Sequence, residues 1–153
     1  MEIGELCVSD IKQLNNILTS AKPYISPYPE YIYWFICEYY PAYIYLAKEE
    51  KQIVGFICSI PIESDKKGVF ILQIFTNPLY RKKNVATLLL KNLTAKYKKY
   101  GEYFVEFSIN PNNEASLNLF KKFAIMNNTA VMPTNRIFNF SILENVYRIE
   151  LKA

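Results

Sequence analysis

Hydrophobic and polar positions recur at helical spacing in the first part of the chain. Between residues 11 and 20 the apolar positions lie three and four apart, which predicts a helix. The segment 22–29 contains three prolines, which exclude a regular helix, so we expect an ordered loop there. An aromatic segment of helical length follows at 31–40 and stops before Pro41.

After Pro41 the spacing becomes that of strands, and later alternates between strands and helices. The pattern predicts strands over 42–47, 53–60, 69–76, 103–109 and 146–151, and helices over 85–100, closed by Gly101, and 115–124. Residues 127–141 carry no clear pattern, and we expect them to shape a pocket. The chain is therefore predicted to be one α/β domain over residues 1–153, beginning with a helix.

Composition removes several classes of function. The chain has no histidine, so no imidazole is present as a base, nucleophile or metal ligand. Its 3 cysteines are scattered without metal-ligand spacing, which predicts reduced thiols, no metal site and a cytoplasmic protein. The apolar runs are too short to span a membrane, and the N-terminus gives no sign of an export leader.

The net charge of +4 comes largely from a basic segment that begins at Arg81 and continues along the helix after it. Such a segment suits a polyanionic cofactor or nucleic acid, or is simply a solvated helix face. No nucleic-acid-reading motif accompanies it, so we expect no nucleic-acid partner.

A basic turn joins the strand at 69–76 to the helix at 85–100. The first N–H groups of a helix lack internal partners and carry positive potential, so this arrangement favours phosphate binding. The turn reads Arg81, Lys82, Lys83, Asn84, Val85, Ala86. Asn84 tolerates a positive φ better than most residues, which lets the chain turn there. The alternative is an ordinary surface turn with lysines.

This turn resembles the pyrophosphate loop of the GNAT superfamily of acetyltransferases, R/Q-x-x-G-x-G/A, with Asn84 at the first glycine. A second segment, from Asn110 to Phe123, resembles the superfamily's N-x-x-A/S-x-x-L-Y/F-x-K helix. The resemblance implies a central, mostly antiparallel sheet with a splayed centre, flanked by about four helices, and acetyl-CoA as co-substrate. It also implies cofactor contacts at Asn113, Ser116 and Phe120; for Asn113 a plain helix N-cap is the alternative, and both roles are compatible.

Shorter segments resemble the L-2,4-diaminobutyrate acetyltransferases of ectoine synthesis, which acetylate the side-chain amine of that diamino acid. They are residues 26–28, 70–73, 104–106, 110–116, 119–124 and 146–149. There are three departures: Leu72 replaces a usual tryptophan, Pro23 or Tyr24 replaces a usual acid, and a C-terminal histidine has no counterpart. The resemblance implies that Tyr28 and Leu72 face the substrate, although for any of the 13 tyrosines packing is the default.

Acetyl transfer to an amine requires that the amine lose a proton, because its pKa is roughly 10. With histidine absent, a carboxylate acting through water is the expected base. Glu106 lies among apolar residues of a strand, where burial would favour its protonated form, or it forms a cross-strand ion pair with a lysine. Glu144 takes the place of a substrate-contacting acid in the resembling family, or is a solvated residue. We assign proton transfer to Glu106 and binding of the substrate's ammonium group to Glu144.

The resemblance further implies that a backbone N–H of residues 74–76 polarises the thioester carbonyl, which places Ile74, Phe75 and Thr76 at the cofactor. Phe120 stands where many members have an acidic tyrosine, and a thiol with a pKa of about 8.5 leaves without one. Two alternatives remain: acetylation of another amine (a polyamine, an aminoglycoside, a peptide N-terminus or an antibiotic precursor), and a non-catalytic module that binds acyl-CoA. A homodimer is compatible with the aromatic content.

Overall fold

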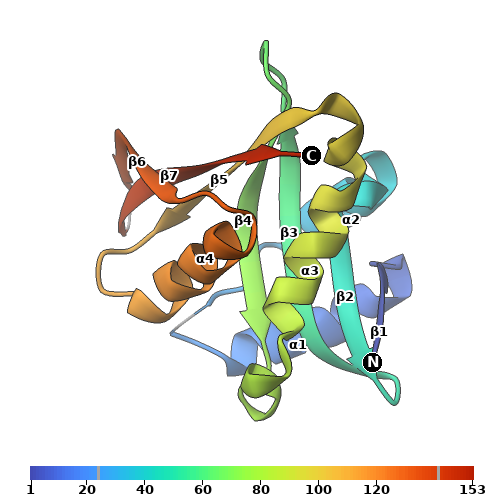
Figure 1. Cartoon of the computed structure of the whole chain (residues 1–153). Coiled ribbons are helices and arrows are strands. Elements are labelled where there is room, and N and C mark those ends of the chain that lie inside the picture. Colours follow the sequence, from blue (N-terminus) through green and yellow to red (C-terminus); the bar gives the residue numbers. More distant parts are fainter. Residues whose placement is uncertain (24, 141) are drawn as a thin grey trace. The chain divides into compact units, whose positions relative to one another are not determined.

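The computed structural model describes residues 1–23, 25–140 and 142–153, and it has a mixed α/β fold (Figure 1). The strands are β1 (Glu2–Glu5), β2 (Ile44–Glu49), β3 (Gln52–Ile62), β4 (Gly68–Thr76), β5 (Glu102–Ile109), β6 (Val131–Asn139) and β7 (Leu143–Lys152). The α-helices are α1 (Ile11–Ser20), α2 (Glu30–Tyr39), α3 (Val85–Thr94) and α4 (Glu114–Met126). Short 3-10 helices are η1 (Val8–Asp10), η2 (Pro41–Tyr43), η3 (Pro78–Lys83) and η4 (Ala95–Tyr100). No helix in the described ranges is long and apolar enough to cross a membrane.

The strands are hydrogen-bonded in the order β1-β2-β3-β4-β5-β7-β6. The β1–β2, β2–β3, β5–β7 and β6–β7 pairs are antiparallel, whereas β4 and β5 are parallel. The β4–β5 register runs from Gly68↔Phe104 to Ile71↔Phe107, although both strands continue beyond it. The expected mixed α/β fold with a mostly antiparallel sheet is therefore confirmed.

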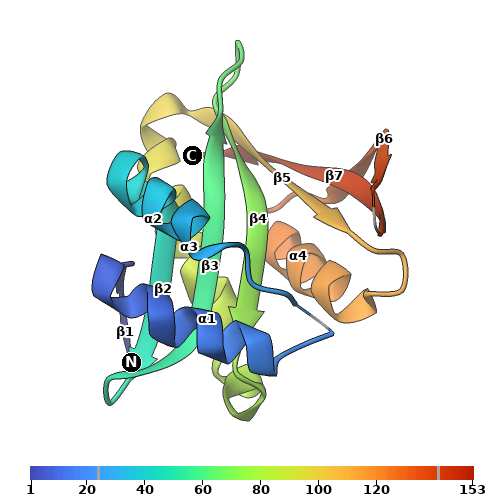
Figure 2. The same cartoon turned by 180° about the vertical axis from the view of Figure 1, so that it is seen from behind.

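The chain divides into two compact units. The first unit comprises Met1–Ile60 and Gln73–Leu93, and the second comprises Pro61–Leu72 and Thr94–Ala153. In the first unit, α1 and α2 cover one face of β2 and β3, and α3 covers the other (Figure 2). Helix α1 buries Ile11, Leu14 and Leu18, the apolar stripe that its spacing predicts.

Gly55 on β3 allows α3 to pack closely against the first unit's strands. A Cβ at this position would collide with Cγ1 of Val85 and would lie 3.2 Å from Cδ1 of Leu89. Val85 and Leu89 are themselves buried. The absent side chain thus determines how near the N-terminal half of α3 approaches β3, and that half contains the last two residues of the predicted phosphate loop, Val85 and Ala86.

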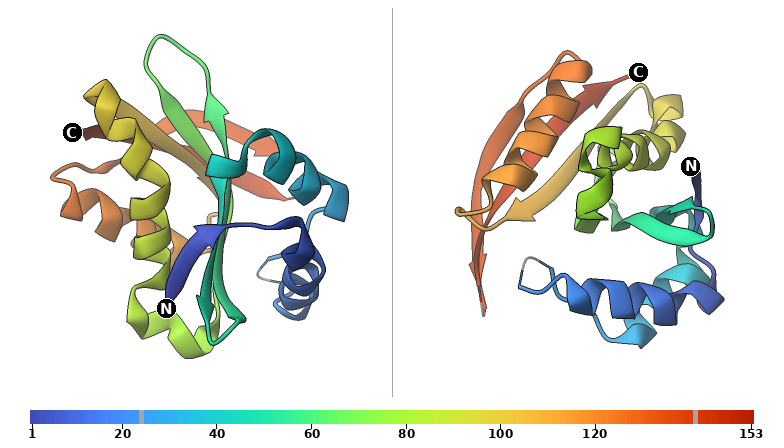
Figure 3. Two further views of the ribbon diagram at one scale, coloured as in Figure 1. Left: turned by 90° about the vertical axis from the view of Figure 1, so that its right-hand side faces the viewer. Right: turned by 90° about the horizontal axis from the view of Figure 1, so that it is seen from below.

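The second unit is built on β5, β7 and β6, with α4 alongside the β6–β7 hairpin (Figure 3). Phe120 of α4 stacks on Phe107 of β5, with ring centres 3.7 Å apart and planes 9° from parallel. Phe123, Ile149 and Leu151 are buried in the same unit. Stacked aromatic rings and aliphatic side chains therefore form its core.

The predicted helices and strands are largely confirmed, with most boundaries shifted by one to three residues and two segments that differ in kind. Residues 42–43 belong to η2 and not to a strand, because Pro41 fixes a helical φ at the start of that turn. The predicted helix over 85–100 is α-helical only to Thr94 and continues as η4, a common tightening at helix ends. Buried Tyr97 of η4 donates a hydrogen bond to Gly68 O (3.0 Å), and Gly101 ends the segment at φ 76° as expected.

Two strands, β1 and β6, were not predicted from the sequence pattern. Because β1 precedes the first helix, the expectation that the chain begins with a helix was wrong. Strand β1 has only four residues and no apolar run, and it exists through pairing with β2 from Glu2↔Lys48 to Glu5↔Tyr45. Strand β6 lies in the unassigned segment 127–141, of which Ser141 is outside the described residues. Pro133 and a register shift between Pro133 and Ile137 break the alternation that would have revealed β6.

Candidate active site

The turn between β4 and α3 has the geometry of an anion-binding loop. Asn77 caps η3, since its Oδ1 accepts from Leu79 N–H at 3.0 Å. Asn84 then takes the left-handed conformation, with φ 59° and ψ 26°, as predicted for this position. The first α-helical hydrogen bond joins Leu88 N–H to Asn84 O at 3.0 Å. The N–H groups of residues 85–87 therefore precede the helical ladder and carry the positive end of the helix dipole.

Basic side chains surround this helix start. Arg81, Lys82 and Lys83 are exposed, and Lys83 Nζ lies 5.0 Å from the centre of the Tyr80 ring. Ala86, the small residue of the loop, is half-buried. Backbone donors, three cations and a small residue at one turn suit a pyrophosphate group, so the residues fit acetyl-CoA by the chemistry of their donors. The preceding residues of β4, Ile74, Phe75 and Thr76, are half-buried.

The proline-containing loop before α2 is held by a buried tyrosine and a glutamine. Tyr28 N–H donates to the Tyr33 hydroxyl at 2.9 Å, and that hydroxyl donates to Gln73 Oε1 at 2.7 Å. Gln73 Nε2 donates to Ser26 O at 2.8 Å. The structure thus brings Tyr28 together with two residues that the sequence analysis did not assign a role. Leu72 is half-buried on β4 in the second unit, and Tyr24 lies outside the described residues.

The second motif lies in the second unit. Asn113 is the N-cap of α4, because its Oδ1 accepts from Ser116 N–H at 3.2 Å. The N-cap alternative is therefore confirmed, and it leaves the cofactor role open. Ser116 is half-buried, whereas the Phe120 ring is 2% exposed and packed on Phe107. The Phe120 side chain therefore belongs to the core of this unit.

Glu106 on β5 is buried and binds two arginines. Its Oε2 accepts from Arg148 Nε at 2.8 Å and lies 2.6 Å from Nη2 of Arg148 and 2.8 Å from Nη2 of Arg136. Arg148 is its cross-strand partner on β7, and Arg136 belongs to β6. The cross-strand ion pair foreseen for Glu106 is present, with arginines where lysines were expected. Two guanidinium groups therefore balance the charge of this buried carboxylate within the second unit.

Arg148 joins this pair to further charges. Burial acts to lower the pKa of Arg148, but hydrogen bonds to Glu106 and to Glu150 outweigh it and raise the pKa. The guanidinium also lies 3.9 Å from the centre of the Phe104 ring. Glu150 in turn accepts from Lys66 Nζ at 2.8 Å. The result is a charged network that connects β5, β6 and β7 within the second unit.

Glu144 near the start of β7 differs from Glu106 in its partners. Its Oε1 accepts from the Ser108 hydroxyl at 2.6 Å, and the residue is half-buried. Among the described residues no cation is recorded as its salt-bridge partner within 4.0 Å. A half-buried carboxylate held by one hydroxyl keeps acceptor capacity for a cationic group such as an ammonium.

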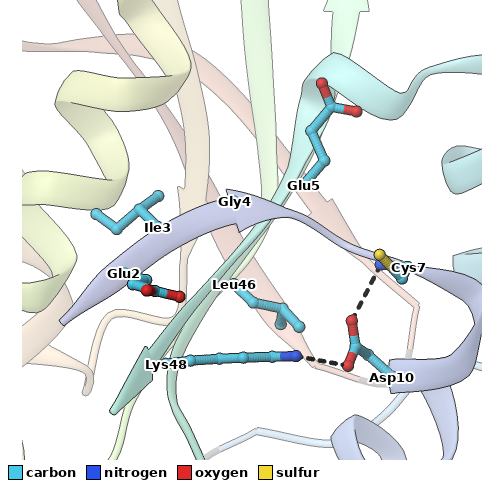
Figure 4. A pocket seen from close by; sticks show the side chains of 8 residues that line it. All are labelled: Glu2, Ile3, Gly4, Glu5, Cys7, Asp10, Leu46 and Lys48. Carbon is cyan, nitrogen blue, oxygen red and sulfur yellow. Dashed lines mark hydrogen bonds and ion pairs between the residues drawn. The ribbon is translucent and has the colours of Figure 1, made fainter. Parts of the chain in front are cut away.

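The described parts of the chain contain hollows, and two of them lie in different units. One, of about 210 Å³, lies beside β1 in the first unit, where Asp10 accepts from Cys7 N–H (3.1 Å) and from Lys48 Nζ (2.8 Å) (Figure 4). It contains none of the predicted site residues. The other, of about 380 Å³, lies at the irregular part of β6 in the second unit. It is lined by Pro133, Asn135, Arg136, Ile137, Asn145, Val146 and Tyr147, so it includes part of the segment expected to shape a pocket.

Of the three cysteines, Cys58 is buried and Cys37 is half-buried, whereas Cys7 is exposed. Cys7, Cys37 and Cys58 are free thiols, and burial raises the pKa of Cys37 to about 11 and that of Cys58 still further. Buried thiols of this kind are poor nucleophiles at neutral pH. Within residues 1–23, 25–140 and 142–153, no group of three His, Cys, Asp or Glu residues could hold a metal ion.

A mixed α/β fold with a basic, anion-binding turn after a central strand is typical of proteins that bind a phosphate-bearing ligand. The sequence profile of the acetyltransferase (GNAT) family matches residues 11–124, and the chain belongs to this family. Family membership, predicted from the loop at Arg81 and the helix at Asn113, is confirmed.

Among its relatives are L-2,4-diaminobutyric acid acetyltransferases. That of Halalkalibacterium halodurans is 32% identical over 99 residues, which are 65% of this chain and 52% of the relative. That of Marinococcus halophilus is 33% identical over 101 residues, 66% of this chain and 59% of the relative. The matches thus span between half and three-fifths of the relatives' length. The fold matches that of diaminobutyrate acetyltransferase EctA from Paenibacillus lautus, solved with L-2,4-diaminobutyric acid and coenzyme A, with a TM-score of 0.76, 17% identity and coverage of 97% and 93%.

Proposed function

We propose that the protein is an N-acetyltransferase that transfers the acetyl group of acetyl-CoA to the side-chain amine of L-2,4-diaminobutyrate. The observation that carries the proposal is the turn at Asn84, where a left-handed residue, three cations and the start of α3 meet. The similarity to diaminobutyrate acetyltransferases supports the choice of substrate. The whole of residues 1–153 would act as one domain, which is supported by a family match that runs through both units.

The reaction forms a C–N bond and breaks a C–S bond. The ammonium first loses a proton, the free amine attacks the thioester carbonyl, and the thiol of coenzyme A leaves. The products are the N-acetyl diamino acid, the thiol and one proton. Because a thiol has a pKa of about 8.5, it leaves without a strong acid, which is consistent with Phe120 at the position of the family's tyrosine.

In this proposal the chain's residues bind and orient the two substrates. The N–H groups of Val85 and Ala86 and the side chains of Arg81, Lys82 and Lys83 would hold the pyrophosphate. A backbone N–H of residues 74–76 would polarise the carbonyl. Asn113 and Ser116 would contact the cofactor arm, and Tyr28 and Leu72 would face the amine.

Glu144 would receive the ammonium group and assist its deprotonation through water. The support is its hydrogen bond from the Ser108 hydroxyl and its half-buried position. Glu106, the other carboxylate expected to be catalytic, is held by Arg136 and Arg148, and we propose an anchoring role for it in place of proton transfer. We further propose that the protein works in the cytoplasm, as its free thiols suggest, and that it forms a homodimer.

The test is release of thiol from acetyl-CoA with mass analysis of the product, across diaminobutyrate, 2,3-diaminopropionate, ornithine, lysine, spermidine and an aminoglycoside. We expect turnover selective for diaminobutyrate. Selective turnover of another amine would overturn the substrate while leaving acetyl transfer in place. Binding of coenzyme A without turnover of any amine would favour the non-catalytic acyl-CoA-binding module.

The phosphate loop is tested in the same assay. Replacing Arg81, Lys82 and Lys83 together by alanine is expected to raise the KM for acetyl-CoA about tenfold or more, because charge-assisted contacts to phosphate are lost. The matched control replaces three exposed lysines outside the turn, Lys12, Lys98 and Lys99, and is expected to change the KM for acetyl-CoA less than twofold. Equal effects of the two variants would show that only the net charge matters.

A further inference from the structure

A line of hydrogen bonds in the first unit joins the loop before α2 to the middle of β4. Gln73 Nε2 donates to Ser26 O (2.8 Å), the Tyr33 hydroxyl donates to Gln73 Oε1 (2.7 Å), and Tyr28 N–H donates to the Tyr33 oxygen (2.9 Å). Tyr33 and Gln73 lie 40 residues apart in sequence. Both ends of the line are backbone groups of the loop, so the two side chains act on the path of the main chain itself.

The two side chains are fixed in place by their surroundings. Tyr33 is completely buried and Gln73 is 9% exposed. The Tyr33 ring meets Phe56 of β3 edge to face, with centres 5.7 Å apart, and lies 5.9 Å from the Tyr28 ring. A ring that is buried and packed against two others is held in place, so its hydroxyl oxygen is a fixed point for the loop.

The direction of each hydrogen bond is determined by the chemistry of the groups. Tyr28 N–H can only donate, so the Tyr33 oxygen accepts from it and turns its own proton to Gln73 Oε1. This assigns the amide orientation of Gln73 and leaves its NH₂ group for Ser26 O. Burial raises the pKa of Tyr33 to about 12, so the hydroxyl stays protonated at neutral pH and remains a donor.

We propose that Tyr33 and Gln73 are positioning residues that hold the Ser26–Tyr28 segment in the conformation required for the acceptor amine. The inference rests on the proposed function, which gives Tyr28 to the amine pocket. Neither residue needs to touch the substrate, because each acts through the backbone of the loop. Loss of the Tyr33 hydroxyl would leave Tyr28 N–H and Gln73 Oε1 without this shared partner and would let the loop shift.

The experiment compares Tyr33→Phe and Gln73→Met with the wild type and with Tyr39→Phe. Tyr39 lies on the same helix and is 64% exposed, so it is the matched control. For Tyr33→Phe and Gln73→Met we expect the KM for the amine to rise about tenfold, while the KM for acetyl-CoA changes less than twofold. Because both variants break one line of bonds, the double variant should have an amine KM close to that of the more impaired single variant.

Hydrogen exchange provides a readout that does not depend on turnover. The amide of Tyr28 is expected to exchange faster in Tyr33→Phe than in the wild type, and at an unchanged rate in Tyr39→Phe. Thermal melting and coenzyme A binding establish that each variant is folded. If exchange at Tyr28 and the amine KM are both unchanged in Tyr33→Phe, the inference is wrong. A parallel rise in both KM values would also overturn it, since that result indicates a general loss of structure.

The two proposals fail in different ways. If the wild type acetylates none of the amines, the proposed function is wrong, and exchange at Tyr28 still decides whether Tyr33 anchors the loop. If the wild type acetylates an amine and Tyr33→Phe binds that amine equally well, the proposed function stands and the positioning role is removed.

Discussion

The two units fix their irregular segments by different means. In the first unit the loop before α2 is held by neutral groups, the Tyr33 hydroxyl and the Gln73 amide. In the second unit the irregular part of β6 is held by the ion pair of Arg136 with Glu106 as well as by the Thr134 hydroxyl, which donates to Val146 O at 2.8 Å. A neutral network depends on geometry, whereas an ion-pair network depends also on pH and salt.

The difference between the neutral and the charged network bears on the roles proposed for Glu106 and Glu144. Glu106 is buried like Tyr33, but its charge is balanced by two guanidinium groups. Glu144 accepts a hydrogen bond from Ser108, and among the described residues no cation forms a salt bridge with it. The partners of a buried carboxylate therefore have to be known before a catalytic role is proposed for it. The charged network is predicted to affect stability, and the neutral network to affect the amine site.

The largest effect is expected for Glu106→Gln. The change removes the charge that two arginines share and leaves Arg148, whose side chain is 35% exposed, facing a neutral amide. Breaking a buried ion pair costs about 3–5 kcal/mol, and partial exposure of the arginines places this loss near the lower end, at about 3 kcal/mol. Urea unfolding measures it, and acetyl transfer at saturating substrate should persist in the folded fraction.

Glu102→Gln is the matched control for that variant. Glu102 lies on the same strand, its side chain is 58% exposed, and its contacts to Lys66 and Lys152 are long, at 3.8 and 3.9 Å. We expect the free energy of unfolding to change by less than about 0.5 kcal/mol. If Glu106→Gln is as stable as Glu102→Gln but loses turnover, Glu106 is the proton acceptor after all and the comparison between the units is broken.

A smaller effect is expected for Gly55→Ala in the first unit. The new methyl group would collide with Val85, a β-branched residue with little rotamer freedom, and α3 would have to move away from β3. We expect a loss of about 2 kcal/mol in unfolding free energy and a higher Kd for coenzyme A, because the start of α3 shifts.

Gly4→Ala controls for the added methyl group, since nothing lies within 4 Å of a Cβ at that position. The two changes are measured by urea unfolding and by calorimetric titration with coenzyme A. A lower Kd for coenzyme A in Gly55→Ala would contradict the view that the packing of α3 against β3 fixes the position of the phosphate loop.

Local features of this molecule could be predicted from its sequence. The positive φ of Asn84, the N-cap at Asn113 and the turn at Gly101 each depend on a few neighbouring residues, and each was predicted correctly. Family membership was predicted from two motifs, and each motif is likewise a short stretch of neighbouring residues. Helix α1 was likewise predicted within its bounds, because its apolar spacing is regular.

Long-range pairing could not be predicted in the same way. Glu106 meets Arg148 only because of the β5–β7 register, which no spacing in the sequence reveals. Tyr33 is one of many aromatic residues on α2, so its burial is not visible in a helix that carries exposed aromatics such as Tyr31 and Trp34. The alternation in β6 is interrupted near Pro133, which concealed the strand that supplies Arg136.

The smallest effect sharpens the contrast in charge between the units. Burial acts to raise the pKa of Glu150, but hydrogen bonds from Lys66 and Arg148 outweigh it and lower the pKa. A lowered pKa in the folded state adds stability above the ordinary glutamate pKa, and that stability is lost as the pH falls. Since Lys66 and Glu150 are both partly exposed, we expect this contribution to the free energy of unfolding to be about 0.5 kcal/mol.

Urea unfolding between pH 6 and pH 3 should therefore show that Glu150→Gln loses less unfolding free energy with falling pH than the wild type does. The control Glu63→Gln, at a side chain that is 74% exposed, should follow the wild type, and so should Tyr33→Phe, whose neutral network has no acid to titrate. Identical acid profiles for Glu150→Gln and the wild type would show that the charged network of the second unit is as insensitive to acid as the neutral one.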